Sequence, residues 1–473
     1  MKKIKVLFIY PESGYNTYNN ISFKNGRYYH GIGILSAVIK KMGCITSLHH
    51  ILNEFNAEKL NKKIIDFNPD LICTSSTTHM MMDVLKIGIF LDEYYKNIPS
   101  IIGGIIVSMD NELIHNIRGF HAAVIGDGEI ALGEIVERMS EGLKLNELFS
   151  GISNIIIKNI SNASIKVKCM DINTIPFGDR DIFKFENLDD YSWFKRLPMM
   201  SSRGCPFNCL FCANSVLSKY YDKNSYVRFR SADNICCEIE ENLKKYPYIN
   251  HIQFQSDIFF KDINWLKEFK TEYKERINLP FHCLLRIEQV NEEVISLLKD
   301  SGCELILMGV ETGDEILRKK AGKNFKQNSI LQAFNLIKKY NIKTGSFNIM
   351  GLPNETVSGL IKLFKINAQI SPDLAQISIY YPYKNTPFYK EVEKFLIDKN
   401  QVYKTYFEKS LLEEKYLVNG FYYYYNNFLS FVTLYKNTNG FFKRKILDFR
   451  VKHRLISEGK LKNVKNSTFR IIF

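Results

Sequence analysis

Three cysteines stand close together in the segment SSRGCPFNCLFCANS, at Cys205, Cys209 and Cys212. Thiolate sulfur is a soft ligand that suits zinc or an iron–sulfur cluster. Structural zinc usually has four protein ligands, and a 4Fe–4S cluster usually takes four cysteines. The next two cysteines, Cys236 and Cys237, lie in a helical pattern. A cluster held by three cysteines would keep one iron open for another ligand, whereas zinc would need a distant fourth ligand.

The segment that carries these cysteines is expected to be an exposed loop, because Gly204, Pro206 and Asn208 are turn residues. Three unliganded core cysteines do not suit such a loop. Ten cysteines in a reducing compartment are not expected to form a disulfide framework. We interpret those outside the loop as small core or helix residues: Cys44, Cys73, Cys169, Cys236, Cys237, Cys283 and Cys303.

The N-terminal residues do not predict secretion. Residues 1–5 are basic, but the apolar run VLFIY that follows them is too short for a signal peptide. No stretch approaches the roughly 20 apolar residues of a membrane span. We therefore expect a cytoplasmic protein.

Six strand-and-helix repeats contain and follow the cysteine segment. The predicted strands are 197–203, 251–256, 281–286, 304–310, 344–350 and 374–380, and the predicted helices are 233–246, 262–275, 291–301, 327–340 and 356–370. This α/β alternation predicts a partial (β/α)6 TIM-type barrel. Barrel enzymes place their chemistry at the C-terminal ends of the strands. The cysteines, which follow the first predicted strand, would then lie in an active-site loop.

The first part of the chain alternates strands and helices in the same way. Predicted strands at 4–10, 69–76, 100–104 and 122–129 predict a doubly wound, Rossmann-like parallel sheet, which binds ligands beyond the carboxyl ends of its strands. We divide the chain into this domain at 1–145, a linker and hairpin at 146–195, the barrel at 196–385, and a small, mostly helical, basic and aromatic-rich C-terminal region at 386–473.

The cysteine segment resembles the signature of the radical S-adenosylmethionine (SAM) superfamily, C-x3-C-x2-C with an aromatic residue, here Phe211, before the last cysteine. The resemblance implies that the three cysteines hold a 4Fe–4S cluster and that SAM chelates its fourth iron. One electron, from a donor such as flavodoxin or ferredoxin, then cleaves SAM to a 5′-deoxyadenosyl radical that abstracts hydrogen from the substrate.

Two further segments, 302–323 and 347–356, resemble the subgroup of this family in which the barrel follows a cobalamin domain. The resemblance places Glu311 near the ribose or methionine moiety of SAM. It places the consecutive residues Gly351, Leu352 and Pro353 near the adenine.

Asp257 and Arg286 follow earlier barrel strands and are expected to face the same cavity. They could equally form a structural ion pair at the mouth of the barrel. The family's Gly-Gly-Glu motif after the second strand is replaced here by QSDIFF. The contacts to the methionine amino group therefore depart from the family pattern.

The N-terminal sheet resembles a cobalamin-binding domain in three segments, 74–79, 101–104 and 125–129. Hydroxyls can hydrogen-bond the amide side chains of cobalamin, and glycines let the backbone approach its ring. The last segment, GDGE, could also be a tight turn into a helix. The cobalamin-binding residues implied by the resemblance are Ser75, Thr77, Gly103, Gly104, Gly126 and Glu129.

No D-x-H-x-x-G motif, which supplies a cobalt-ligating histidine in the methionine synthase type of domain, occurs in the sequence. The resemblance then implies that cobalamin is bound without a histidine below the cobalt. A domain that has lost its cobalamin would have the same sequence. We interpret His79 as a loop or helix-start residue.

The resemblance favours a cobalamin-dependent radical methyltransferase that acts on an unactivated carbon of a small molecule or peptide. Radical oxidation, cyclisation or rearrangement of such a substrate without methyl transfer is the alternative. A third hypothesis is a non-enzymatic zinc or iron–sulfur regulator that binds nucleic acid, but the sequence carries no nucleic-acid-binding signature.

The net charge of +14 is concentrated in residues 396–473, which carry fifteen Lys and Arg against six Asp and Glu. A solvated basic face is the simplest interpretation, and weak contact with an anionic membrane surface is another. The aromatic segment 421–435 is expected to pack against the barrel; the alternative is that it lies on a membrane.

Overall fold

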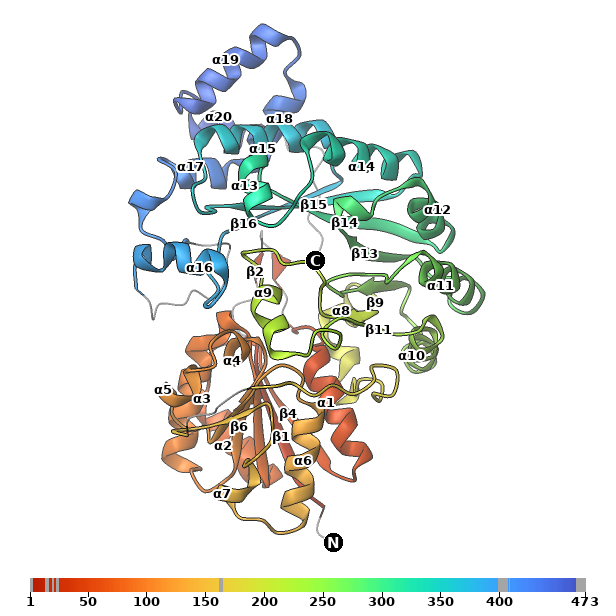
Figure 1. The fold of residues 1–473 in the computed structure, drawn as a ribbon, viewed down its shortest axis with the longest axis vertical. Coiled ribbons are helices and arrows are strands. Elements are labelled where there is room, and N and C mark those ends of the chain that lie inside the picture. Colours follow the sequence, from red (N-terminus) through yellow and green to blue (C-terminus); the bar gives the residue numbers. More distant parts are fainter. Residues whose placement is uncertain are drawn as a thin grey trace.

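The computed structural model describes residues 3–12, 17–18, 21–22, 25–160, 165–398, 407 and 409–464. Figure 1 shows two α/β bodies, the N-terminal one in red and orange and the barrel in green and cyan, with the short helix α9 (Asn214–Leu217) between them. Each body contains a six-stranded sheet. The α/β fold class predicted from the sequence is confirmed.

The N-terminal sheet has the strand order β4-β1-β5-β6-β7-β8. Its strands are β1 (Lys5–Pro11), β4 (Ile45–Ile51), β5 (Leu71–Ser75), β6 (Ser100–Gly103), β7 (Ala122–Val124) and β8 (Ile155–Ile157). All neighbours are parallel except β7 and β8. The chain adds β4 on one side of β1 and the later strands on the other, so the topological switch point lies between β1 and β5. Ligands of doubly wound sheets bind at this point.

Alternate residues of β1 belong to two hydrophobic cores on opposite faces of the sheet. Val6 and Phe8 pack with residues of α1 (His30–Lys41) and α6 (Glu129–Ser140). Leu7 and Ile9 pack with residues of the helices on the other face. Those helices include α2 (Ala57–Phe67), α3 (Met81–Tyr94), α4 (Ile105–Met109) and α5 (Leu113–Asn116).

The sequence pattern does not place two strands in this sheet: β4, and β8, which lies in the segment predicted as a linker and hairpin at 146–195. β4 is an edge strand, and most of its side chains are only half-buried, so its sequence ITSLHHI has no buried apolar run. β8 pairs antiparallel with β7 and continues the first sheet beyond residue 145. β4 is therefore hidden by its partial exposure, and β8 by its length of three residues.

The second sheet has the order β16-β15-β14-β13-β12-β9, with every neighbouring pair parallel. Its strands are β9 (Arg196–Met199), β12 (His251–Phe254), β13 (Phe281–Leu285), β14 (Cys303–Glu311), β15 (Lys343–Met350) and β16 (Leu374–Ile379). Helices between them are α10 (Ala232–Lys245), α11 (Ile263–Arg276), α12 (Glu292–Asp300), α13 (Glu315–Lys320), α14 (Gln327–Lys339) and α15 (Val357–Ile370). This is the predicted partial barrel of six strand-and-helix repeats.

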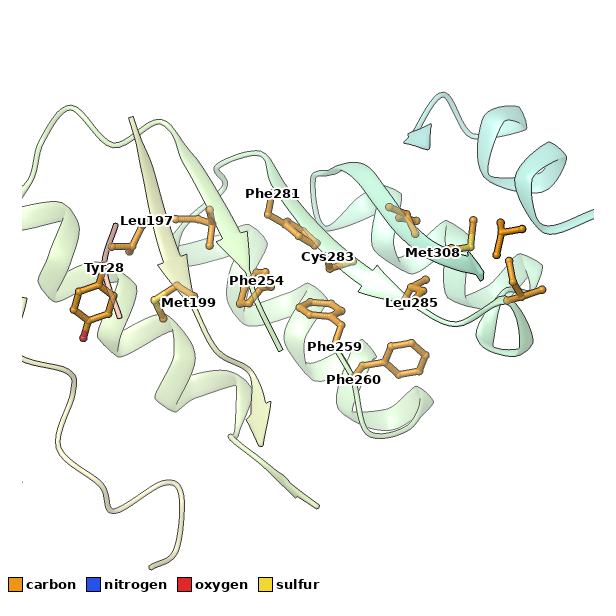
Figure 2. Packing of buried hydrophobic residues seen from close by; sticks show 14 of the residues in the cluster. Tyr28, Leu197, Met199, Phe254, Phe259, Phe260, Phe281, Cys283, Leu285 and Met308 are labelled. Carbon is orange, nitrogen blue, oxygen red and sulfur yellow. The ribbon is translucent and has the colours of Figure 1, made fainter. Parts of the chain in front are cut away.

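Aromatic side chains fill the core of the barrel's first half. Figure 2 shows Phe254, Phe259 and Phe281 close together. The ring of Phe254 lies 4.8 Å from that of Phe259 and 5.5 Å from that of Phe281, measured between centroids. Such contacts add to the stabilisation from burying the rings, and they fix β12 and β13 side by side.

The predicted first barrel strand divides in two. β9 ends at Met199, and the chain then forms β10 (Ser202–Arg203), which pairs antiparallel with β11 (Arg228–Phe229). The buried hydroxyl of Ser201 donates to the carbonyl of Phe259 at 2.6 Å, which holds this bend against the second repeat. The cysteine segment is therefore part of the long connection between β10 and β11, which pair with each other at its two ends.

The C-terminal region packs on the barrel through α15. The ring of Phe364 on α15 stacks at 5.0 Å on Phe431 of α18, and Tyr424 of α17 is fully buried. The helices are α16 (Pro387–Val392), α17 (Phe421–Asn426), α18 (Phe428–Asn437), α19 (Phe441–Lys452) and α20 (Glu458–Lys462). Residues 399–406, 408 and 465–473 of the predicted basic region lie outside the described residues. Within the described part, no helix has the length and hydropathy of a membrane span.

Candidate functional site

The cysteine loop is fixed at its start and in its middle. Gly204 has a φ of +75°, and a Cβ at this position would overlap the carbonyl oxygen of Tyr226, so the turn requires glycine. Leu210 donates its N–H to the carbonyl of Ala321 at 3.1 Å and accepts from the N–H of Phe388 at the same distance. These bonds attach the loop to two later parts of the barrel.

The three thiols have different surroundings. Cys209 is buried, and its Sγ accepts from Nη1 of Arg286 at 3.3 Å, whereas Cys212 accepts more weakly from Asn214. Burial raises the pKa of the Cys205 thiol, and burial raises the pKa of the Cys212 thiol to about 12. Free thiolates at Cys205 and Cys212 are therefore disfavoured at neutral pH. Binding of a metal would have to displace these protons.

The donor set suits a cluster better than a single ion. Within the described ranges, no group of three or more His, Cys, Asp or Glu side chains is arranged to hold a metal ion. A tetrahedral zinc ion needs its ligands around one point. In an iron–sulfur cluster each cysteine binds a different iron, so the thiols stand further apart. Three soft donors on one loop, with no fourth ligand grouped with them among the residues that the structure describes, fit a cluster with an open iron.

Arg286 lies against the cysteine loop. Its guanidinium lies 3.8 Å from the centre of the Phe207 ring and forms an ion pair with Glu288 at 2.7 Å. The structural ion pair between Arg286 and Asp257, considered as an alternative from the sequence, is not formed. The positive charge instead points at the sulfur of Cys209.

Asp257 is joined to the loop through an amide. Nδ2 of Asn214 donates to the Asp257 carboxylate at 3.2 Å, and burial raises the pKa of that carboxyl. The two residues before Asp257, Gln255 and Ser256, make different contacts. Ser256 accepts from the N–H of Ser201 at 2.7 Å, and Gln255 lines a cavity that residues of the N-terminal sheet also line.

Glu311 has an unusual backbone conformation. Its φ is +64°, and the register of β14 against β15 shifts between Gly309 and Glu311. A non-glycine residue in this region is uncommon and costs conformational energy, which proteins retain mostly at functional sites. The buried carboxylate forms an ion pair with Lys323 at 2.6 Å. The bulge thus turns Glu311 to a defined orientation at the end of its strand.

A cavity of about 440 Å³, which we call the seam cavity, lies between the two bodies. Thr77 from the N-terminal domain, Phe211 and Cys212 from the cysteine loop and Glu311 from the barrel all line it. The hydroxyls of Thr77 and of its neighbour Thr78 are buried and have no hydrogen-bond partner in the described part of the chain. Buried hydroxyls without a partner are costly unless a ligand or water satisfies them.

The sequence analysis did not identify several residues that line the seam cavity. His79 is buried in a 3-10 turn; its Nε2 lies 3.3 Å from the Tyr383 hydroxyl, and its ring lies 4.5 Å from that of Tyr381. Asn348 and Gln376 line the cavity from neighbouring barrel strands. A polar residue within a barrel strand was the available signal for Gln376. The Asn348 amide also serves the barrel core, because it donates to the carbonyl of Gln376 at 2.9 Å and accepts from the Asn367 amide on α15 at 2.9 Å.

Gly351, Leu352 and Pro353 do not line the seam cavity. The N–H of Gly351 donates to Oε2 of Glu355 at 2.7 Å, and Leu352 is buried. Glu355 is half-buried, but its Oε1 atom is buried; burial of the carboxyl raises its pKa to about 8. This loop is therefore built around a carboxyl that the sequence analysis did not single out.

A second cavity of about 390 Å³, which we call the sheet cavity, lies at the carboxyl ends of β1, β5, β6 and β7. It brings together five of the residues implied by the resemblance to cobalamin domains: Ser75, Gly103, Gly104, Gly126 and Glu129. The buried polar atoms Tyr28 Oη, His30 Nε2 and Thr74 Oγ1 face it or its edge and lack a partner in the part of the chain that is described. A polar ligand at the switch point would satisfy them.

Four charged residues join the two domains beside this cavity. Arg203 on β10 forms ion pairs with Asp127 at 3.2 Å and with Glu129 at 2.6 Å, and Arg228 on β11 pairs with Asp127 at 2.6 Å. Burial alone would raise the pKa of the Asp127 carboxyl, but the two guanidiniums outweigh it and lower that pKa. Glu129 also begins α6, so the GDGE segment is both a helix start and the contact with the barrel.

Comparison with known proteins identifies both bodies. The radical SAM superfamily profile matches residues 199–365, and the B12 binding domain profile matches residues 27–136. An uncharacterized methyltransferase of Pyrococcus horikoshii is 26% identical over 365 residues, which are 75% of this chain and 76% of that protein.

Two solved structures share the fold. The radical SAM methyltransferase TsrM from Kitasatospora setae, solved with tryptophan substrate and a SAM analog, is 16% identical, with a TM-score of 0.63 over 82% of this chain and 76% of that one. The cobalamin-dependent SAM radical enzyme OxsB, solved with aqua-cobalamin and SAM, is 16% identical, with a TM-score of 0.67 over 96% of this chain and 71% of that one. The match covers both sheets and their order along the chain.

We predict that Arg203→Met destabilises the joined domains. The substitution leaves the buried carboxylate of Glu129 without its cation, which costs about 3–5 kcal/mol. Arg276→Met is the matched control, because Arg276 forms three ion pairs with Asp233, Glu240 and Glu272 within the barrel and is more exposed. Urea unfolding of both variants measures how much each substitution lowers the free energy of unfolding. If both substitutions lowered the free energy of unfolding equally, the ion pairs between the domains would contribute no more to stability than those within the barrel.

We predict that Glu355→Gln changes the pH dependence of stability. The pKa of the folded-state carboxyl is about 8 against an ordinary value of 4.5, so between these values the folded chain retains a proton that the unfolded chain has lost. Stability from this group therefore falls as pH rises, by up to about 1.4 kcal/mol per pH unit. Urea unfolding at about pH 5.5 and about pH 7.5 should show a shallower loss in the variant. The same loss in both proteins would contradict the prediction.

Proposed function

We propose that this chain, which is a radical SAM enzyme carrying a B12-binding domain, methylates an unactivated carbon of a small-molecule or peptide substrate. The cofactors of these two domains are a 4Fe–4S cluster, SAM and cobalamin. The seam cavity supports the proposal most directly. Residues of both domains and a cluster cysteine line the same space, so a substrate there can be reached from either domain.

In this proposal Cys205, Cys209 and Cys212 bind the cluster. Arg286 donates a hydrogen bond to Cys209, and hydrogen bonds and positive charge near cluster sulfurs set the reduction potential. Phe207 and Glu288 keep the guanidinium in that position. When bound, the cofactors supply the radical that activates the substrate carbon and the methyl group that it receives.

The SAM-binding residues we propose are Phe211, Asp257, Glu311, Arg286 and the loop Gly351–Pro353. Glu311 carries a carboxylate that Lys323 holds at the cavity wall, where it can accept hydrogen bonds from ribose hydroxyls. Asp257 is held by Asn214, which also donates to Cys212. The loop is held by the bond between Gly351 and Glu355, and its contact with the adenine rests on the family resemblance.

The cobalamin-binding residues we propose divide between the two cavities. Ser75, Gly103, Gly104, Gly126 and Glu129 line the sheet cavity, and Thr77 lines the seam cavity. Its hydroxyl and that of Thr74 have unsatisfied hydrogen-bonding capacity within the described residues. The absence of the D-x-H-x-x-G motif leads us to propose that no histidine of such a motif binds the cobalt from below.

The reaction needs an electron donor, and we propose a small flavodoxin or ferredoxin. All ten cysteines are free, which agrees with a reducing, cytoplasmic setting.

We predict that Cys209→Ala abolishes cluster formation and spares corrinoid binding. Anaerobic reconstitution of the unchanged chain should give about four iron and four sulfide per chain. The variant should retain only a small fraction of that iron, because one iron has lost its ligand. Cys237→Ala is the matched control on the surface of α10. Zinc in place of iron, or full iron content in the Cys209 variant, would contradict the cluster assignment.

We predict that methyl transfer requires the corrinoid. With a substrate identified, the reconstituted chain should yield a product heavier by one CH2 unit only when cobalamin is present. Mass spectrometry with methyl-labelled SAM measures this directly. A product of unchanged carbon count would instead support radical oxidation, cyclisation or rearrangement.

A further inference from the structure

The outward face of α19 is apolar, although it points to solvent. Phe442 is 81% exposed, Ile446 is 59% exposed and Phe449 is 58% exposed. They follow the spacing i, i+4, i+7, so they form one stripe along the helix. Leu447 and Val451 lie on the opposite face and are buried. The helix therefore has two apolar faces, of which the protein's own core covers only one.

Basic residues border the exposed stripe on both sides. With 3.6 residues per turn, Lys445 and Lys452 fall along one edge, and Lys443 and Arg450 fall along the other. All four are exposed. The acidic residue of this helix, Asp448, lies away from the stripe and pairs with Lys365 of α15 at 2.7 Å. The outward face of α19 therefore consists of an apolar stripe with a row of positive charges, which we call the basic frame, along each edge.

Helices α17 and α18 hold α19 in a fixed orientation. The Tyr424 hydroxyl on α17 lies 3.1 Å from the carbonyl of Val451, and Tyr435 of α18 donates to Asp448 at 2.9 Å. Figure 1 shows α19 at the end of the molecule opposite the N-terminal sheet, where neither domain covers its outer side. The stripe is thus presented outward, away from the seam cavity.

We propose that α19 docks this protein on an anionic membrane surface. A helix with large apolar side chains on one face and lysine or arginine along its borders suits the bilayer interface, where rings enter the acyl boundary and cations meet lipid phosphates. The charge pattern favours lipid over a second copy of this strongly basic chain, because two such frames would repel each other. The helix lies on the membrane and does not span it.

Vesicle co-sedimentation of the full-length chain tests this inference independently of the catalytic proposal. The chain should bind vesicles of phosphatidylserine and phosphatidylcholine at least about tenfold more tightly than vesicles of phosphatidylcholine alone. Phe442→Ser combined with Phe449→Ser should weaken binding to the anionic vesicles at least about tenfold. Lys443→Glu combined with Arg450→Glu should also weaken it, and high salt should reduce binding of the unchanged chain.

Ile65→Ser combined with Tyr94→Ser is the matched control, because these residues are 63% and 67% exposed in the N-terminal domain. It should bind like the unchanged chain, and circular dichroism should show that all variants are folded. Equal binding to both kinds of vesicle, or unchanged binding by the α19 variants, would overturn the proposal. Self-association that the phenylalanine substitutions abolish, without vesicle binding, would also overturn it and assign the stripe to a second copy.

Discussion

The ion pairs of Arg203 with Asp127 and Glu129 hold the arrangement of the site together. Arg203 is the last residue of β10 and stands directly before Gly204 and Cys205, so the contact that joins the domains also fixes the root of the cysteine loop. Removing charged groups from water is costly, and such groups remain only when each has its partner. Separating the domains would leave these charges unpaired. The barrel and the sheet therefore present their strand ends to each other in a defined way.

Because these ion pairs hold the two domains together, both cavities lie along the boundary between the domains. The sheet cavity lies where a doubly wound sheet binds ligands, and the seam cavity lies at the C-terminal ends of barrel strands, where barrels carry out chemistry. The cysteine loop lies between them as an excursion from the β10–β11 hairpin. Within this arrangement, two local features orient individual side chains of the site. The bulge at Glu311 turns one carboxylate, and Arg286 brings a positive charge to Cys209.

The sequence predicted the parts of this arrangement that depend on local pattern. Buried strands such as β1 and β5 have apolar runs, and the cysteine spacing is local, so both could be recognised. The edge strand β4 has half-buried residues and therefore no such run. Ion pairs are set by contacts between distant residues, so the partner of Glu129, 74 positions away, could not be read from the sequence. Arg286 pairs with Glu288, only two positions away, rather than with Asp257, and this choice depends on where the fold places Asp257. The uncovered face of α19 likewise became visible only in the fold.

The central claim is that the three cysteines hold a cluster whose remaining iron is free to bind SAM. Electron paramagnetic resonance of the reduced, anaerobically reconstituted full-length chain tests it most directly, because the spectrum reports the ligands of the iron. We predict a 4Fe–4S signal whose g values shift when SAM is added. A signal that SAM leaves unchanged, or a reconstituted chain without an iron-based signal, would contradict the account.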